Sequence, residues 1–305
     1  MRVLTAAKDE IVAMGFAPGG SLLAVGHQRH GLFLWDLGSD TPPIRCDSPG
    51  YIRPQVLTYS SDGQRLYLFA GRRFAVNLAT GRSVPAGPEA THRVFDCATS
   101  TDGTRVVMIH GAWSAPKITA WAFAGPDDCW DELWTVESGQ GGTGGLALAA
   151  ADHTLAHLRR KPTLHWPYRY ELVTRDLNSG LETGHGEYPY SYPSRLIYRP
   201  DGKQLVGLHE MTLLVWPIPR PRKPLYVRND TRKHFTSAVY HPSGRYLFTT
   251  SNDTTVLVWD TESWRPVSRF TWNIGRLRCV AVSPDGTLAA AGSDRGQVMV
   301  WDVDL

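Results

Sequence analysis

The sequence predicts an all-β repeat protein of seven similar units, and two periodic markers and one strand pattern carry this prediction. The first marker is a four-residue turn of the Ser-Pro-Asp-Gly type, whose seven copies end 40 to 50 residues apart. The copies are Ala17–Gly20, Ser60–Gly63, Ser100–Gly103, Ala150–His153, Arg199–Gly202, His241–Gly244 and Ser283–Gly286. A period of this length is typical of a repeat architecture.

The second marker is a dipeptide that reads Trp-Asp in its clearest copies. Its second residue lies 14 to 23 positions after the end of each turn. The copies are Trp35-Asp36, Val76-Asn77, Trp121-Ala122, Arg175-Asp176, Trp216-Pro217, Trp259-Asp260 and Trp301-Asp302. Two markers that share one period are much harder to obtain by chance than one.

The strands of each unit are predicted from the residues around the turn. Pro fixes φ at the entry to a tight turn, Asp can accept a bond from the backbone ahead, and Gly accepts a positive φ. Apolar runs flank the turn, such as Arg278–Val282 and Leu288–Ala291, and predict a hairpin. A third run, clearest at Thr255–Trp259, is apolar on both faces and must be covered from both sides. A further turn such as Leu78–Gly81 leads into a more polar outer strand, so each unit is predicted to be a four-stranded antiparallel sheet.

Together the Trp-Asp pairs, the Pro-Asp-Gly turns and the spacing of about 42 residues resemble those of the WD-repeat β-propellers. The resemblance implies a single propeller domain over residues 1–305 with seven four-stranded blades. Their approximate ranges are 8–47, 51–87, 91–137, 142–187, 193–229, 234–272, and 277–305 together with 1–6. The last unit stops after its third strand, and residues 2–6 form a strand-like run. We therefore expect this N-terminal strand to complete the last blade.

The buried hydrogen-bond network of the family is incomplete in this chain. The network commonly joins a His, from a Gly-His pair, to an Asp, a Ser or Thr, and the Trp. Here the His position is held by Ala7, Gly50, Ala90, Gln140, Pro189, Thr231 and Asn273. The resemblance assigns the other network residues to blade six, as Ser251, Asp253, Thr255 and Trp259. It also implies a structural role for Trp35 and Trp301. We expect apolar packing to hold most blades together.

Composition agrees with a soluble all-β protein. The chain has 29 Gly and 21 Pro, which suits many turns, and a net charge of +3, which is too small to indicate nucleic-acid binding by itself. No segment approaches the roughly 20 apolar residues of a membrane span, and residues 1–10 lack the apolar core of a signal peptide. The four Cys have no metal-ligand spacing and are expected to be reduced thiols. We expect a cytoplasmic location and no membrane partner.

The irregular loops of blades three to five predict the binding surface. In a propeller, the loops between second and third strands and those between blades emerge on one rim, the top, where variation distinguishes one propeller from another. The long connections are 110–117, 138–145, 159–170 and 187–193. Trp, Tyr and Arg combine large contact area with a polar group, as interface hot spots do. The predicted partner-binding residues are Trp113, Arg159, Arg160, Lys161, His165, Trp166, Tyr168, Arg169, Tyr170, Tyr190 and Tyr192. The alternative is that these rings only pack together to order long loops.

Other chemical patterns in the chain are weaker. The basic, proline-rich loop 217–224 should leave blade five on the opposite rim, as a second binding surface or as a solvated face. Gly139, Gly141 and Gly144 have dinucleotide-binding spacing, but no βαβ unit surrounds them. His27 and His30 lack further metal ligands. No Ser lies in a nucleophile elbow. From these patterns together, no metal, no cofactor and no catalytic residue is predicted.

A non-catalytic scaffold for a protein or peptide partner, alone or within a larger complex, is therefore the favoured function. Two alternatives stay open: an enzyme or small-ligand binder that uses the central channel, and a nucleic-acid-binding propeller that uses residues 159–169. A scaffold predicts that a Trp166→Ala, Tyr192→Ala double mutant folds and loses its partner. An enzyme predicts a cluster of buried carboxylates or His at the axis, and nucleic-acid binding predicts affinity that falls steeply with salt.

Overall fold

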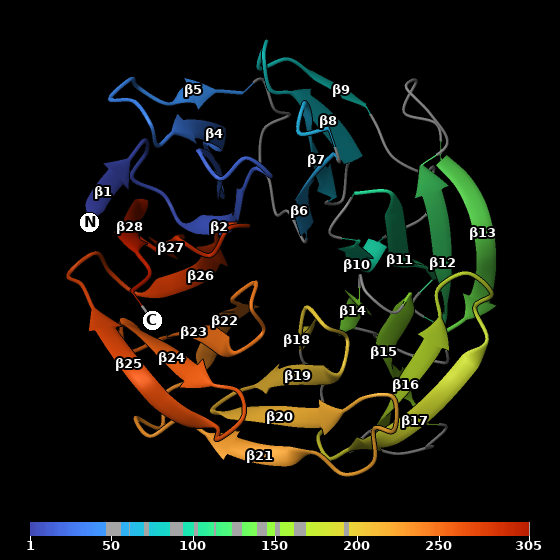
Figure 1. The fold of residues 1–305 in the computed structure, drawn as a ribbon. Coiled ribbons are helices and arrows are strands. Elements are labelled where there is room, and N and C mark those ends of the chain that lie inside the picture. The colour runs from blue at the N-terminus through green and yellow to red at the C-terminus, as the bar shows by residue number, and fades with distance from the viewer. Residues whose placement is uncertain are drawn as a thin grey trace. The chain divides into compact units, whose positions relative to one another are not determined.

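The fold is an all-β, seven-bladed propeller of four-stranded antiparallel sheets, as the sequence predicts. The structure is a computed structural model, and Figure 1 follows its strands in chain order. It describes residues 1–46, 56–60, 62–69, 73–85, 94–100, 103–112, 114–123, 130–138, 145–149, 153–161, 169–191 and 195–304. No helix in these ranges has the length and apolar character to cross a membrane.

The chain divides into two compact units. Unit 1 comprises Met1–Ala86 and Asn229–Leu305, and unit 2 comprises Gly87–Arg228. Unit 1 holds blade one, β2 (Ile11–Phe16), β3 (Leu22–His27), β4 (Gly31–Asp36) and β5 (Ile44–Arg45); blade two, β6 (Val56–Tyr59), β7 (Arg65–Phe69), β8 (Arg73–Asn77) and β9 (Ser83–Pro85); blade six, β22 (Phe235–Tyr240), β23 (Tyr246–Ser251), β24 (Thr255–Asp260) and β25 (Arg265–Thr271); and blade seven, β26 (Leu277–Val282), β27 (Leu288–Ser293), β28 (Gln297–Asp302) and β1 (Arg2–Thr5). Unit 2 holds blade three, β10 (Val94–Thr99), β11 (Arg105–Ala112), β12 (Ala115–Phe123) and β13 (Trp130–Glu137); blade four, β14 (Leu146–Ala149), β15 (Thr154–Arg160), β16 (Tyr170–Asp176) and β17 (Glu182–Tyr188); and blade five, β18 (Arg195–Tyr198), β19 (Gln204–His209), β20 (Thr212–Pro217) and β21 (Leu225–Arg228).

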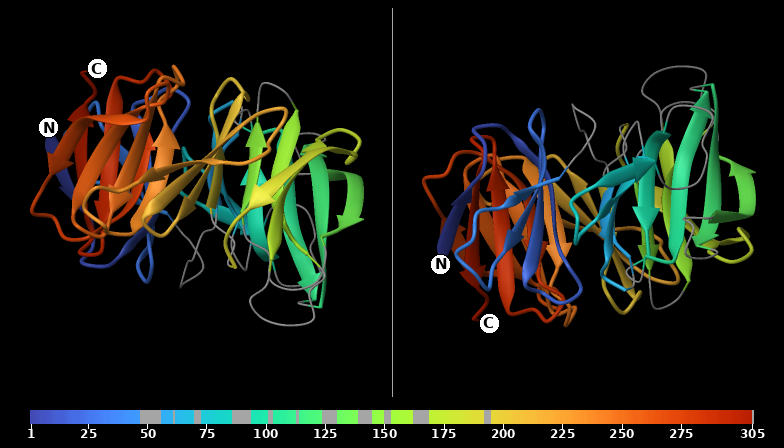
Figure 2. Two further views of the ribbon diagram at one scale, coloured as in Figure 1. Left: turned by 90° about the horizontal axis from the view of Figure 1, so that it is seen from below. Right: turned by 90° about the horizontal axis from the view of Figure 1, so that it is seen from above.

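The N-terminal strand completes the last blade, which confirms the predicted closure. β1 pairs antiparallel with β28, with Arg2 opposite Val300 and Thr5 opposite Gln297. The two views of Figure 2 show this blue strand beside the red C-terminal strands. Leu4 is 2% exposed and packs in a core cluster shared by blades seven and one. Both main-chain pairing and apolar burial therefore fasten residues 2–5 to the end of the chain.

The turn signature works as its chemistry predicts, and the last copy shows how. The Gly286 amide donates to the Ser283 carbonyl at 2.9 Å, and Gly286 has a φ of 77°. Asp285 Oδ1 accepts from the hydroxyl of Ser283 at 2.6 Å and from the amide of Thr287 at 3.0 Å. The Ser283 hydroxyl oxygen also accepts from the Leu288 amide at 2.9 Å. One short motif thus satisfies the polar groups between two strands.

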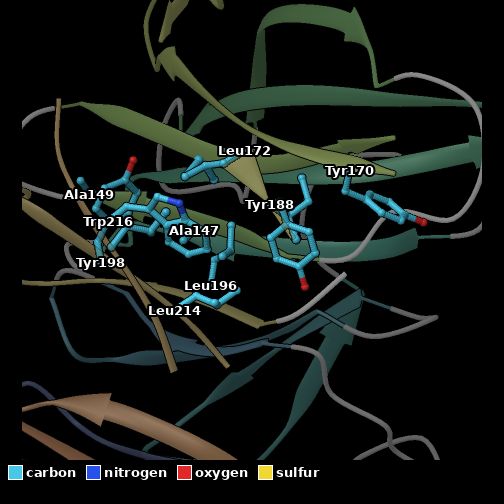
Figure 3. Close-up of a cluster of buried hydrophobic side chains, with 12 residues drawn as sticks. Ala147, Ala149, Tyr170, Leu172, Tyr188, Leu196, Tyr198, Leu214 and Trp216 are labelled. Atoms are coloured by element: carbon cyan, nitrogen blue, oxygen red, sulfur yellow. The ribbon is translucent and has the colours of Figure 1, made fainter. Parts of the chain in front are cut away.

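Apolar packing between neighbouring blades forms the core within each unit. In blade six the central strand β24 is buried on both faces, from Thr255 to Trp259. Phe248 and Val258 pack with Ala289 and Trp301 of blade seven. In unit 2, blades four and five share the cluster of Figure 3, which contains Trp216. A sheet covered on both faces needs the continuous apolar strands that the sequence shows.

The structure separates Trp259 from the other three network residues of blade six. Asp253 Oδ1 accepts from the Thr255 hydroxyl at 2.5 Å. The indole N–H of Trp259 instead donates to Thr249 Oγ1 at 2.9 Å, inside the blade. The Ser251 hydroxyl donates to the His234 carbonyl at 3.2 Å. Trp259 has a single donor, so Thr249, which the resemblance did not assign, takes the place expected of a network hydroxyl.

Candidate functional site

The described part of the predicted binding surface lies at one end of blade four. Arg160, the last residue of β15, is opposite Tyr170, the first of β16, and Tyr170 is opposite Tyr188, the last of β17. The Lys161 amide donates to the Arg169 carbonyl at 2.7 Å. We call this the upper end of a blade: the end where its second strand passes into its third and its fourth strand leads to the next blade. The predicted basic residues 160, 161 and 169 are gathered there.

Five of the predicted binding residues lie outside the described residues, and their contribution stays a prediction. They are Trp113, His165, Trp166, Tyr168 and Tyr192. Gly139, Gly141 and Gly144 also lie outside the described residues.

A pocket of about 410 Å³ opens at the upper end of blade four. Its lining comes from the start and end of the loop between β15 and β16, and from the connection to blade five. The lining residues are Lys161, Arg169, Tyr170, Glu187, Tyr188, Pro189, Tyr190 and Ser191. Four predicted residues, at 161, 169, 170 and 190, thus share one concave surface with residues that the prediction did not include.

The aromatic rings at this pocket are held in place by one another. Tyr190 is half-buried and stacks on His209, with ring centroids 3.7 Å apart and planes 11° apart. Tyr188 is buried, stacks on Trp216 and meets Tyr170 edge to face. Figure 3 shows Tyr170, Tyr188 and Trp216 in the cluster between blades four and five. Tyr170 and Tyr188 therefore order the pocket wall, and of the three tyrosines Tyr190 offers the most ring surface to a ligand.

Sequence reasoning missed Tyr188 and His209 at this site. Tyr188 stands in a run of alternating tyrosines, and its position at the end of a strand could have indicated a packed ring. His209 comes from blade five, and its Nδ1 lies 3.4 Å from the Tyr188 hydroxyl. This hydrogen bond depends on how blade five is positioned against blade four. No local pattern in the sequence encodes that position.

Arg159 differs from its basic neighbours because carboxylates in blade four already engage its guanidinium group. Arg159 Nε lies 2.8 Å from Glu171 Oε1, and its NH1 lies 2.5 Å from Glu182 Oε1. Burial raises the pKa of Glu182, but the bond from Arg159 and the charges of Arg159 and Arg175 outweigh it and leave this pKa below its ordinary value. By contrast Arg169 is exposed, and no ion pair engages its side chain within the part of the chain that the structure describes. Arg169 is the more available cation for a partner.

Arg175 occupies the Trp position of the second marker and forms a buried polar group of its own. Its Nε donates to His157 Nε2 at 3.1 Å, and its other nitrogens bond the Gly180 carbonyl and Glu182. Burial, followed by the positive charge of Arg175, lowers the pKa of His157 to about 3, so the ring is neutral and can accept. His157 lies two residues beyond the partner of Arg175 on β15, as Thr249 does beyond the partner of Trp259 on β23. Blade four therefore keeps the geometry of the marker with different chemistry.

The proline-rich loop 217–224 packs on blade four. The Glu187 amide donates to the Arg222 carbonyl at 2.9 Å. A side chain at Gly184 would crowd Pro219 O at 3.3 Å, and one at Gly186 would overlap Pro221 O. The loop leaves β20 at Pro217, the end opposite the upper end, as expected. Its backbone then lies along β17, which gives it a packing role.

The histidines near the start of the chain fasten a turn. The Arg29 amide donates to Asp9 Oδ2 at 2.5 Å, and His30 Nδ1 lies 3.2 Å from the same oxygen. His27 is buried, and its Nδ1 lies 3.3 Å from the Asp9 carbonyl. No group of three or more His, Cys, Asp or Glu side chains among the described residues could hold a metal ion.

The sequence matches the family model "WD domain, G-beta repeat" at residues 223–260 and 264–302. In the structure the first match covers β21 to β24 and the second covers β25 to β28. Each match therefore joins the outer strand of one blade to the first three strands of the next.

Curated relatives align with part of the chain only. Transcription initiation factor TFIID subunit 5 of Caenorhabditis elegans is 30% identical over 40% of this chain and 18% of the relative. THO complex subunit 3 of Arabidopsis thaliana is 28% identical over 35% of this chain and 34% of the relative. Small ribosomal subunit protein RACK1 of C. elegans is 32% identical over 26% of this chain and 25% of the relative. The chain thus matches about a third or less of the length of each of these relatives.

A solved structure matches the whole chain in fold. The β-propeller domain of Cps50 (Swd1) from Myceliophteria thermophila has a TM-score of 0.74, with 15% sequence identity. The match covers 99% of this chain and 98% of that one. At this identity the similarity concerns the fold.

Proposed function

Because the chain is a WD40-repeat β-propeller, a family whose members typically act as protein-interaction scaffolds in complexes, we propose that it is a non-catalytic scaffold. Its partner is a protein or peptide, bound at the upper ends of blades three to five. Three of the relatives support this proposal in kind, since their names describe subunits of TFIID, of the THO complex and of the small ribosomal subunit. The partner of this chain must be inferred from its own surface.

The observation that carries the proposal is the pocket of about 410 Å³ at blade four. Pockets of about 300–1,000 Å³ hold small ligands, so this one accommodates a few side chains of a bound segment. Tyr190 supplies an aromatic surface already ordered by His209, which lowers the entropy lost on binding. Lys161 and Arg169 supply positive charge at the edge, and Glu187 and Ser191 supply acceptors for peptide N–H groups. This combination suits a peptide that carries both an apolar and an acidic side chain.

Reversal of charge at the pocket tests the proposal. We expect a Lys161→Glu, Arg169→Glu variant to fold, because both side chains are largely exposed and the Lys161 pair with Glu171, at 3.6 Å, contributes at most about 1 kcal/mol. The matched control is Arg265→Glu, Arg269→Glu on the exposed outer strand of blade six. Tagged forms of the intact chain are compared by quantitative mass spectrometry of the proteins that they capture.

The expected result is a set of proteins that the wild type and the control capture and that the pocket variant loses. The Trp166→Ala, Tyr192→Ala variant should lose the same set. Equal capture by all four forms would refute the binding surface, and a set that disappears after nuclease treatment would support the nucleic-acid alternative instead.

A further inference from the structure

A second pocket, of about 430 Å³, lies between blades six and seven of unit 1, at their upper ends. Thr254, from the turn between β23 and β24, forms one side. Trp272 and Arg276, from the connection between the blades, and Arg295, from the turn between β27 and β28, form the others. This pocket shares no lining residue with the pocket at blade four, and what we infer from it does not depend on the proposed function.

Reciprocal hydrogen bonds between Arg276 and Asp294 fix the backbone on two sides of this pocket. The Arg276 amide donates to Asp294 Oδ1 at 3.0 Å, and the Asp294 amide donates to the Arg276 carbonyl at 2.9 Å. Gly275 has a φ of 104°, and a side chain there would collide with Asp294 Oδ1 and with the Arg295 side chain. The absence of a Cβ thus lets the stem of Arg295 lie over the connection. The two arginines are anchored at their bases and belong to the lining of the pocket.

Trp272 forms a rigid apolar wall. Its ring stacks on Phe270, with planes 5° apart and centroids 5.7 Å apart. Its centroid also lies 4.8 Å from that of the buried Trp301. An indole held on two sides keeps little freedom to lose when a ligand packs against it.

The cations of this region are available, whereas its acids are engaged. Arg276 and Arg295 are exposed, and neither side chain forms an ion pair within the described ranges. The connection from β1 to β2 packs on the turn that carries Arg295, because a Cβ at Gly296 would overlap the Ala7 carbonyl. That connection adds the exposed Lys8.

The acids beside Lys8 are already paired. Asp9 accepts from the Arg29 amide at 2.5 Å and from the Glu10 amide at 2.9 Å. Glu10 lies 3.0 Å from Arg278 Nε. Asp294 is the one acid in the lining of the pocket, and its Oδ1 is taken by the Arg276 amide.

From this geometry we infer that the pocket between blades six and seven binds an acidic peptide segment of a partner protein. Guanidinium groups pair with carboxylates through parallel hydrogen bonds, and Arg276 and Arg295 supply two of them. An apolar side chain of the segment packs on Trp272. Asn273 and Thr254 serve the peptide backbone, and Asp294 accepts a peptide N–H. A phosphate backbone has no such N–H to offer, which favours a peptide over a nucleic-acid backbone.

The test uses a phage-displayed library of random 12-residue peptides on the intact chain. Four forms are compared: wild type, Arg276→Glu with Arg295→Glu, Arg265→Glu with Arg269→Glu as the matched control, and Lys161→Glu with Arg169→Glu. Thermal midpoints check folding, which these exposed side chains should leave within about 2 °C of wild type. Fluorescein-labelled copies of the selected peptides then give dissociation constants, with a 20-residue oligothymidylate as the nucleic-acid probe.

We expect wild type and control to select peptides rich in Asp and Glu with an apolar residue nearby. The Arg276→Glu, Arg295→Glu form should bind these peptides at least about tenfold more weakly and should gain Lys- and Arg-containing peptides. The inference is wrong if wild type selects no acidic class, if the reversed form binds within about twofold of wild type, or if the oligothymidylate displaces the peptides. Loss of the acidic peptides in the Lys161→Glu, Arg169→Glu form alone would move the acidic site to blade four and overturn this inference while supporting the other.

Discussion

The pair Arg175 and His157 of blade four can be exchanged for the pair that blade six uses. Arg175→Trp with His157→Thr should place an indole N–H beside a hydroxyl, as Trp259 and Thr249 are placed at 2.9 Å. The register of the two blades is the same at these positions. We therefore expect the two substitutions to compensate each other in a double-mutant cycle.

The single substitutions should each be costly. Arg175→Trp removes three hydrogen bonds of a side chain that is 7% exposed. Breaking a buried ion pair costs about 3–5 kcal/mol, but Glu182 is 37% exposed and keeps Arg159, so about 2–3 kcal/mol is expected. His157→Thr leaves Arg175 Nε without its acceptor and should cost about 1–2 kcal/mol. The new Trp–Thr bond should recover about 1 kcal/mol, so the double variant should be more stable than the sum predicts.

Urea unfolding of the intact chain, followed by circular dichroism, measures the four free energies of the cycle, and hydrogen exchange in β15 and β16 assigns the change to blade four. The matched control combines Arg175→Trp with His241→Thr, whose hydrogen bonds stay within blades six and seven and which should be additive. Additivity of the Arg175 and His157 substitutions within about 0.5 kcal/mol would refute the idea that blade four keeps the geometry of the marker.

Three further substitutions test closure, packing and charge. Burial raises the pKa of Asp96 to about 6, so the folded state takes up a proton before the unfolded state does. Wild type should therefore gain about 2 kcal/mol over Asp96→Asn in urea unfolding as the pH falls from 6 to 4. Leu4→Ala should cost about 2–4 kcal/mol in thermal or urea unfolding, because this side chain of β1 is 2% exposed. Gly186→Ala should displace the proline-rich loop and speed its cleavage in limited proteolysis, because the added Cβ would overlap the backbone of the loop.

Each of these has a comparison that can contradict it. A gap between wild type and Asp96→Asn that does not change with pH would mean that the carboxyl titrates alike in both states. Val3→Ala, on the 48% exposed neighbour in β1, should be nearly neutral, and an equal loss from both positions would exclude burial as the cause. Gly19→Ala has nothing within 4 Å of its new Cβ and should leave proteolysis unchanged.

The fold could be predicted from sequence because its determinants are local and repeated. Turns such as Ser283–Gly286 satisfy their own polar groups, so seven copies reveal seven hairpins without knowledge of distant contacts. The pairing of β1 with β28 could also be predicted, because a missing outer strand in the last unit leaves one strand-like run to fill it. The repeats therefore indicate a contact between residues that are far apart in the sequence.

The chemistry of the sites could not be predicted in the same way. Arg175 looks like a lost Trp in the sequence, and only the strand register shows that His157 accepts its hydrogen bond. Loop 217–224 looks like a solvated basic segment until Gly184 and Gly186 are seen to admit its backbone. Two arginines 19 residues apart in the chain, at 276 and 295, meet at one pocket because β26 pairs with β27 in blade seven, with Leu277 opposite Ser293. Such contacts depend on strand register and on packing between segments that are distant in the sequence.

The pairing of Arg2 with Val300 gives this protein a particular problem during translation. Among the strands of the propeller, β1 is synthesised first and β28, with which it pairs, is synthesised last, so a nascent propeller carries an unpaired strand with an apolar Leu4 until β28 has emerged. Closing a loop of this length costs about 5 kcal/mol of chain entropy in an unstructured chain, and much less once the intervening sheets have formed. Closure is therefore expected late, and a chain that stalls before residue 297 presents an open β-edge to chaperones and to other nascent chains.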